Sequence, residues 1–466
     1  MLACGGSPAT PPRAPAPATT PAACEHARSD VVLAPLPASV PAALAPTRAA
    51  LEAGQPLDAA SLGIEVLEDP SAPADVRASA GWLVAHALFA AGLHQSALAV
   101  VDQLTNTGPA RGPLPAELQP LVLALSREPH TRDTAQRMLD GSRAAGATPT
   151  GPAYALPLAR GALEAGDPAI AEAVLASVPR AAPEWLDAQW TRAEAALYLT
   201  QFDRAAAAFA SLAETDPCAR RRDLARLSLA RLYFGAGTGG GDGRGESMLN
   251  AYTLFDAVDP YGPYASDAAL GRAWAAMWLD AFDESREAVD RIDHAFRQRT
   301  VEVDVLEAML ALQRCDAATG RAALARVSAR AALLAELRAS LPDDDEALAQ
   351  RATEWVRGDA TLGGALETLR QSLRADDVVR DAIEARAALA HEQEVLAAAP
   401  AAFRASPAGQ RAEQDLFVAA SFGTSQLAER VRSRANGIVD DAGVQAARLD
   451  ELGPALDACS AEATTN

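Results

Sequence analysis

A small residue recurs at a nearly regular interval through the first two-thirds of this chain of 466 residues. Most of the steps are 34 to 38 residues long, which fits two helices of about a dozen residues each and two short turns. The positions are Ala59, Ala97, Ala135, Ala171, Ala205, Ala251, Ser285 and Gly320. The residues four places further on are apolar, with the first as the exception: Gly63, Val101, Leu139, Leu175, Phe209, Phe255, Val289 and Leu324. The pattern predicts an all-α array of about eight helix pairs over residues 41–340, each buried against its neighbours.

The stretch from Thr191 to Pro217 is the clearest of these pairs. Two short antiparallel helices are expected, and in the second helix Ala205 and Phe209 lie one turn apart on the same face. The small side chain lets the two helices approach, and the phenyl ring fills the space beside it. Asp216-Pro217 ends the pair because proline disfavours a helical conformation in the residue before it.

Glycine and proline stand where the first helix of a pair should turn into the second. The clearest turns are Gly54-Gln55-Pro56, Gly92 and Gly166-Asp167-Pro168. Glycine supplies a left-handed cap, and proline opens the next helix, where its missing N–H does no harm. The one long step, between Ala205 and Ala251, contains the glycine-rich segment from Gly235 to Gly245, which we expect to form an inserted loop. It matches GxGxxG only formally, because the dinucleotide-binding motif needs a preceding strand and a helix is expected here.

Two of the pairs, Thr191 to Pro217 and Ala265 to Ile292, resemble the tetratricopeptide repeat (TPR) family. The resemblance implies a right-handed superhelix whose first helices line a concave groove that binds a protein or peptide. A generic α-solenoid is the alternative, because several of the other pairs are degenerate and alanine-rich helices inflate a search for small residues.

Four tryptophans fall in predicted first helices: Trp82, Trp190, Trp274 and Trp278. The TPR resemblance implies that some of these rings line the groove. The alternative is that they pack between helices, as large aromatic side chains commonly do.

The periodicity is lost after residue 340, and the helices lengthen. One apolar stripe consists of Ala420, Leu427, Val431, Ile438, Ala442, Leu449 and Leu452. Its partner in the preceding helix consists of Val378, Ala382, Ala385, Leu389 and Leu396. Their heptad-like spacing predicts a long-helix hairpin over residues 341–454 that caps the array, followed by a disordered tail at 455–466. A coiled-coil dimer is the alternative, so the oligomeric state stays open.

The first 40 residues form a Pro/Ala-rich leader, which we expect to be a disordered tether. Leu2-Ala3-Cys4-Gly5 with this spacer resembles the lipobox and linker of bacterial lipoproteins, which implies that Cys4 carries a lipid. The match departs from the family pattern because no charged and apolar leader precedes Cys4 in these residues. The other four cysteines, Cys24, Cys218, Cys315 and Cys459, fit no zinc spacing, and we expect isolated thiols. The alternative is a disulfide in an oxidising compartment, and the sequence does not choose among the three possible pairings.

Composition and motifs exclude several kinds of chemistry. The formal net charge is −20, which argues against nucleic acid and anionic lipid surfaces as partners. The sequence contains no lysine, so a phosphate-binding P-loop, a kinase ATP lysine and a pyridoxal Schiff base are excluded. The six histidines show no metal-ligand spacing, and His391 in HEQE lacks the second histidine of a zinc protease. We therefore expect no catalytic residue, no metal and no cofactor.

These observations predict a non-catalytic scaffold or adaptor for protein–protein interaction, lipid-anchored at Cys4 in the bacterial cell envelope and facing the periplasm. The alternatives are a cytoplasmic TPR scaffold without an anchor and, less favoured by the missing motifs, an accessory subunit of a periplasmic enzyme.

Overall fold

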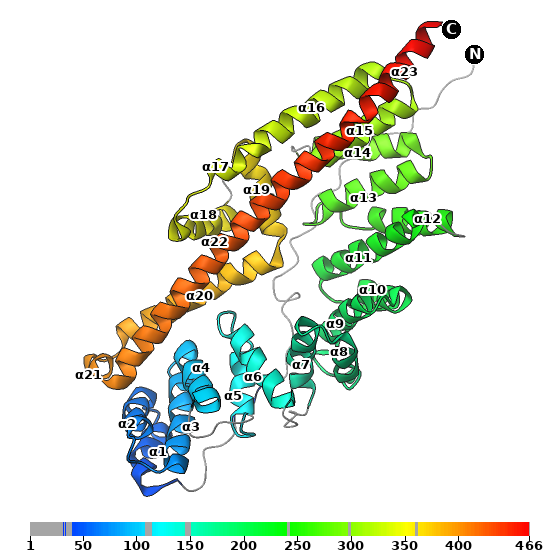
Figure 1. Ribbon diagram of the computed structural model, residues 1–466. Coiled ribbons are helices and arrows are strands. Elements are labelled where there is room, and N and C mark those ends of the chain that lie inside the picture. Colours follow the sequence, from blue (N-terminus) through cyan, green and yellow to red (C-terminus); the bar gives the residue numbers. More distant parts are fainter. Residues whose placement is uncertain are drawn as a thin grey trace, which may run out of the picture. The chain divides into compact units, whose positions relative to one another are not determined.

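The computed structural model describes residues 31, 33, 40–107, 114–144, 151–239, 243–296, 300–358 and 362–465. Regular structure in these residues is helical throughout, without a strand, which confirms the all-α class (Figure 1). The chain divides into two compact units. We call the described residues between 200 and 299 the short unit, and the described residues of 28–199 and 300–466 the long unit.

The short unit is built from helices that pack against their neighbours in sequence. They are α10 (Phe202–Thr215), α11 (Ala219–Thr238), α12 (Arg244–Asp256), α13 (Ala265–Trp278) and α14 (Phe282–Phe296). Each packs on the next, and α11 also touches α13. At the crossing of α12 and α13, Gly271 leaves room for the Phe255 ring, which a Cβ at that position would overlap. α10 ends at Thr215, before Asp216-Pro217, as expected.

The first half of the long unit is a series of short helices. They are η2 (Ala42–Leu44), α1 (Ala45–Glu52), α2 (Pro56–Glu68), α3 (Ala74–Ala90), α4 (His94–Asp102), η3 (Gln103–Thr107), α5 (Gln119–Leu125), α6 (Arg132–Ala144), α7 (Pro152–Glu164), α8 (Pro168–Leu175) and α9 (Trp185–Tyr198). Contacts again run mainly from one helix to the next, for example from α2 to α3 and from α3 to α4.

The second half of the long unit contains the longest helix. Its elements are α15 (Val301–Gln313), α16 (Ala317–Ala335), α17 (Leu337–Ser340), α18 (Asp345–Arg357), α19 (Gly364–Ala375), α20 (Asp377–Ala398), α21 (Ala401–Ala405), α22 (Pro407–Asp450) and α23 (Leu452–Thr465). α20 and α22 lie side by side, joined through the short α21 (Figure 1). The expected hairpin is therefore present within the chain. It also packs on α2 and α4, where Leu396, Phe403 and Leu416 join the core of the first helices.

The periodic small residues lie where the sequence pattern places them. All eight are buried, and each lies in the second helix of an expected pair, one in each even-numbered helix from α2 to α16. In six of the eight cases the residue five places earlier has a positive φ, between 52° and 79°. These turn residues are Gly54, Gly92, Gly166, Thr200, Asp280 and Cys315. A left-handed residue thus ends the first helix at a fixed distance before the small residue of the second.

Three local expectations differ from the structure. Gly235 to Thr238 complete α11 instead of forming a loop, and residues 240–242 lie outside the described part. In α20 the buried stripe begins at Val379, so the expected Val378 is 47% exposed. Finally, α23 occupies the segment expected to be a disordered tail, because Leu456 is buried against α16 at the position of Gly320.

The cysteines also differ from the expectation of isolated thiols. Cys315, in the turn between α15 and α16, forms a disulfide with Cys459 of α23, across 144 residues of sequence. Cys218 is disulfide-bonded as well. Cys4 and Cys24 lie outside the described residues.

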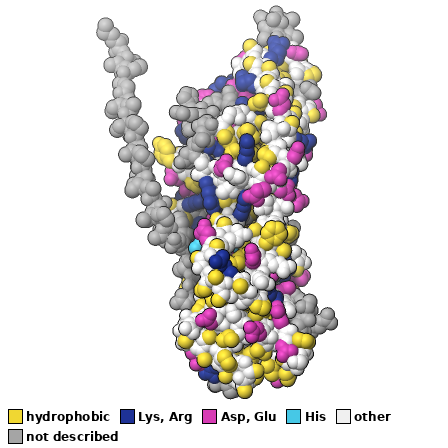
Figure 2. Space-filling view, turned by 90° about the vertical axis from the view of Figure 1, so that its left-hand side faces the viewer, with side chains coloured by type: hydrophobic (Ala, Val, Ile, Leu, Met, Phe, Trp, Pro, Cys, Tyr) yellow, Lys and Arg dark blue, Asp and Glu magenta, His cyan; other side chains and the backbone are white. Residues whose placement is uncertain are grey.

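Within the described residues, no helix is long and apolar enough to cross a bilayer. On the face in Figure 2, arginine and acidic side chains are interspersed, and no continuous basic surface forms there.

Candidate functional site

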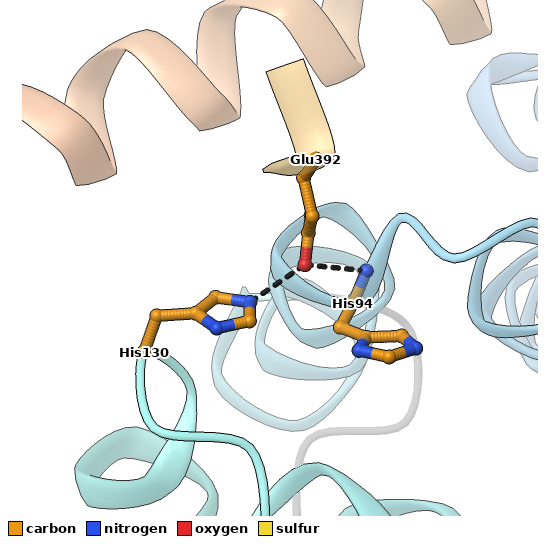
Figure 3. A group of neighbouring side chains, drawn as sticks. All are labelled: His94, His130 and Glu392. Carbon is orange, nitrogen blue, oxygen red and sulfur yellow. Dashed lines mark hydrogen bonds and ion pairs between the residues drawn. The ribbon is translucent and has the colours of Figure 1, made fainter. Parts of the chain in front are cut away.

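Three side chains from distant parts of the long unit meet where α20 crosses two turns (Figure 3). His94 is the first residue of α4, His130 stands just before α6, and Glu392 lies on α20. Their nitrogen and oxygen atoms that could act as ligands all lie within 4.8 Å of one another. We call these three residues the His-His-Glu cluster.

The Glu392 carboxylate is the centre of the cluster. Its side chain is only 3% exposed. Oε1 accepts hydrogen bonds from the backbone N–H groups of His94 (3.0 Å) and Gln95 (3.2 Å), and Oε2 accepts one from Gln95 (3.1 Å). A carboxylate at this place satisfies two of the free N–H groups at the start of α4 and is favoured by the helix dipole.

His130 completes the shell around this carboxylate. Its Nε2 lies 2.6 Å from Glu392 Oε1, and its side chain is 2% exposed. The other ring nitrogen, Nδ1, is buried without a hydrogen-bond partner among the described residues.

The His94 ring lies on the open side of the cluster. It stacks on Phe89 with ring centroids 4.8 Å apart, and its plane is nearly parallel to that of His130. Its Nδ1 is 3.8 Å from Glu128 Oε2, and the two side chains are 23% and 38% exposed. Solvent therefore reaches the cluster from the side of His94 and Glu128.

Further polar contacts hold α20, α21 and α22 against the first helices. Arg132 of α6 pairs with Asp381 of α20 at 2.7 Å. Ser61 of α2 lies within hydrogen-bonding distance (3.3 Å) of the hydroxyl of Ser406, which directly follows α21. The cluster is thus part of a contact zone that includes α2, α4, α6 and α20, and this fixes its geometry.

Sequence spacing missed this cluster. His94 and His130 are 36 residues apart, which is one period of the array, and both stand at the start of a second helix. That coincidence is a signal that the two rings come close in space. Nothing in the local sequence connects them with Glu392, which is 262 residues beyond His130.

The four tryptophans expected in a groove have different environments. Trp82 is buried in α3 and packs on the His86 ring at 4.3 Å. Trp190 of α9 and Trp274 of α13 are half-buried. Trp278 is 42% exposed, and the Arg244 guanidinium lies over its ring at 4.5 Å. Of these four tryptophans, only Trp278 is therefore exposed.

Among the displaced pKa values of the long unit are those of His86 and Asp415. Burial lowers the pKa of His86 to about 4, because the charged ring would lose its hydration. Burial raises the pKa of Asp415 on α22 to about 6, and Arg411 at 3.9 Å offsets only part of that effect.

No protein-family model matches the chain, and no curated protein matches it significantly. The class of the protein is therefore defined by its fold alone, as an all-helical protein over the described residues.

Proposed function

We propose that this protein is a non-catalytic, TPR-like α-solenoid scaffold that binds a protein or peptide partner, and that it is lipid-anchored through Cys4 in the bacterial cell envelope. The observation that carries the proposal is the agreement between sequence period and burial: eight small residues, one per helix pair, are all buried. Stacked helix pairs with small residues at their crossings form extended surfaces suited to binding other proteins.

Trp278 is the best candidate for a partner contact. Its ring is exposed and carries the Arg244 guanidinium on one face. Tryptophan and arginine are the side chains most enriched in the energetic centres of protein interfaces. A partner that covers this pair would gain both apolar area and a cation–π contact already in place.

Photo-crosslinking tests this assignment. A photoreactive phenylalanine analogue placed at position 278 should capture a discrete partner in intact cells. The matched control is the same analogue at Phe417, an exposed ring on α22 of the other unit. A partner that is captured equally from both positions, or from neither, would remove Trp278 from the interface.

The disulfide between Cys315 and Cys459 supports a location of the protein outside the cytoplasm. Such bonds persist in the periplasm and on cell surfaces and are rare in the reducing cytosol. Metabolic labelling with a fatty acid, followed by fractionation, tests the anchor. Label that disappears in Cys4→Ala supports lipidation, whereas a wild-type chain without label favours the unanchored cytoplasmic scaffold.

A further inference from the structure

The His-His-Glu cluster has the donor set of a transition-metal site. Two imidazoles and one carboxylate are ligands that Zn²⁺ accepts, with a fourth position left for water or another side chain. We infer that His94, His130 and Glu392 bind a divalent metal ion of the Zn²⁺ type. The ion would hold α20 against the turns that precede α4 and α6. This inference is independent of the partner-binding role proposed above.

The distances in the cluster are compatible with such an ion. In a tetrahedral zinc site with bonds of about 2.0–2.1 Å, neighbouring ligand atoms are roughly 3.3 Å apart. Here all ligand atoms lie within 4.8 Å, and the closest pair, His130 Nε2 and Glu392 Oε1, is 2.6 Å apart. Side-chain rotations that move atoms by about 1 Å would bring the three donors to metal-binding distances.

Charge is the second argument. Glu392 is almost fully buried, and the groups around it are two backbone N–H groups and one imidazole. A buried carboxylate needs a compensating charge. A divalent cation bound beside Glu392 would supply that charge.

The remaining groups have the positions expected of supporting residues. The N–H groups of His94 and Gln95 orient the Glu392 carboxylate, as outer-shell donors do in metal sites. Phe89 fixes the plane of the His94 ring by stacking. Glu128, 3.8 Å from His94 Nδ1 and partly exposed, can take the fourth position or hold a water there.

The test is titration of the chelator-treated full chain with Co²⁺ and Zn²⁺. We expect one equivalent of Co²⁺ to give the intense visible absorption of a tetrahedral site, and Zn²⁺ to displace it. The decisive variant is His94→Ala, which removes one ligand ring but keeps the backbone N–H and the contact between His130 and Glu392. It should fold, as judged by circular dichroism, and lose at least about 100-fold in metal affinity.

Glu392→Gln and His130→Gln provide further variants, and both should weaken binding similarly. The matched control is His391→Ala, because His391 is the neighbour of Glu392 on α20 and its side chain is 75% exposed. It should leave the affinity unchanged. The inference is overturned if the wild type gives no tetrahedral Co²⁺ spectrum, or if His94→Ala binds metal as tightly as the wild type does.

Discussion

The two units use the same kind of helix but are held together differently. In the described part of the short unit, helices contact their neighbours in sequence and, at α11 and α13, the next but one. In the long unit, α22 contacts α2 and α4, and Glu392 bonds to residues almost 300 positions earlier. A local sequence repeat can specify packing between neighbouring helices. Contacts between helices that are distant in sequence depend instead on a few specific side chains. Loss of one such side chain should therefore damage the long unit far more than the short one.

Glu392→Ala is expected to have the largest effect. It leaves His130 and two N–H groups of α4 without their acceptor, and each buried donor left without a partner costs about 1–3 kcal/mol. Hydrogen exchange followed by mass spectrometry should show faster exchange in α4 and α20, with peptides of α11 to α13 unchanged. The neighbouring exposed residue offers a control, His391→Ala, which should exchange like the wild type. Equal acceleration in both units would contradict the comparison.

The disulfide between Cys315 and Cys459 is a covalent contact between distant segments of the long unit. Its removal in the double variant Cys315→Ser/Cys459→Ser should destabilise the long unit by about 2–4 kcal/mol, because the open chain regains the entropy of a long loop. Exchange in α23 and α16 should increase first. If the reduced and oxidised wild type unfold at the same denaturant concentration, the bond adds nothing to the stability of this unit.

The same contrast explains what the sequence could and could not predict. Small residues such as Ala205 and Ser285, both fully buried, were predictable because every repeat faces the same steric problem at its crossing. The left-handed turns at Gly54, Gly92 and Gly166 were predictable for a similar reason. These features recur, so each one confirms the others.

The cluster around Glu392 was not predictable in this way. Its contact with His94 depends on how α20 lies across the first helices, and this is decided by core residues such as Leu396 and Phe403 that belong to no repeat. The HEQE sequence at His391 drew attention to the wrong histidine, since that side chain is exposed and its neighbour Glu392 makes the contacts. A single long-range contact has no periodic signal.

Acidification should increase the difference in stability between the two units, because His86 lies in the long unit. Its pKa falls from 6.5 in the unfolded chain to about 4 in the folded one, so the unfolded state binds more protons between these pH values. Stability from the neutral ring is therefore complete above about pH 6.5 and declines as the pH falls towards 4, by about 3 kcal/mol in total. Denaturant titrations across this range give the free energies of unfolding of the wild type and of His86→Phe. The difference between the two should be smaller at low pH than at pH 7, because only the wild type loses this contribution.

The contribution of Asp415 to stability must be measured separately, because it changes with pH in the opposite direction. Its folded pKa of about 6 exceeds the ordinary 3.8, so its neutral form stabilises the fold at low pH and this contribution is lost as the pH rises towards 6. The Asp415→Asn variant removes it. If the difference between wild type and His86→Phe stays constant with pH in the Asp415→Asn background, burial of His86 does not control acid stability.

The smallest effect is expected in the short unit, at the crossing of α12 and α13. A methyl group in Gly271→Ala would overlap the Phe255 ring and force it to move, at a cost of about 1–3 kcal/mol, while alanine returns about 1 kcal/mol of helix propensity. We therefore expect Gly271→Ala to lower the free energy of unfolding of the short unit by about 1 kcal/mol. Gly235→Ala in α11 is the control, since a Cβ there meets no atom within 4 Å and should stabilise the helix instead. Opposite signs for the two glycines, with the loss relieved in Gly271→Ala/Phe255→Leu, would locate the effect at the crossing. If both glycine variants were stabilising, close neighbour packing would not be what holds this unit together.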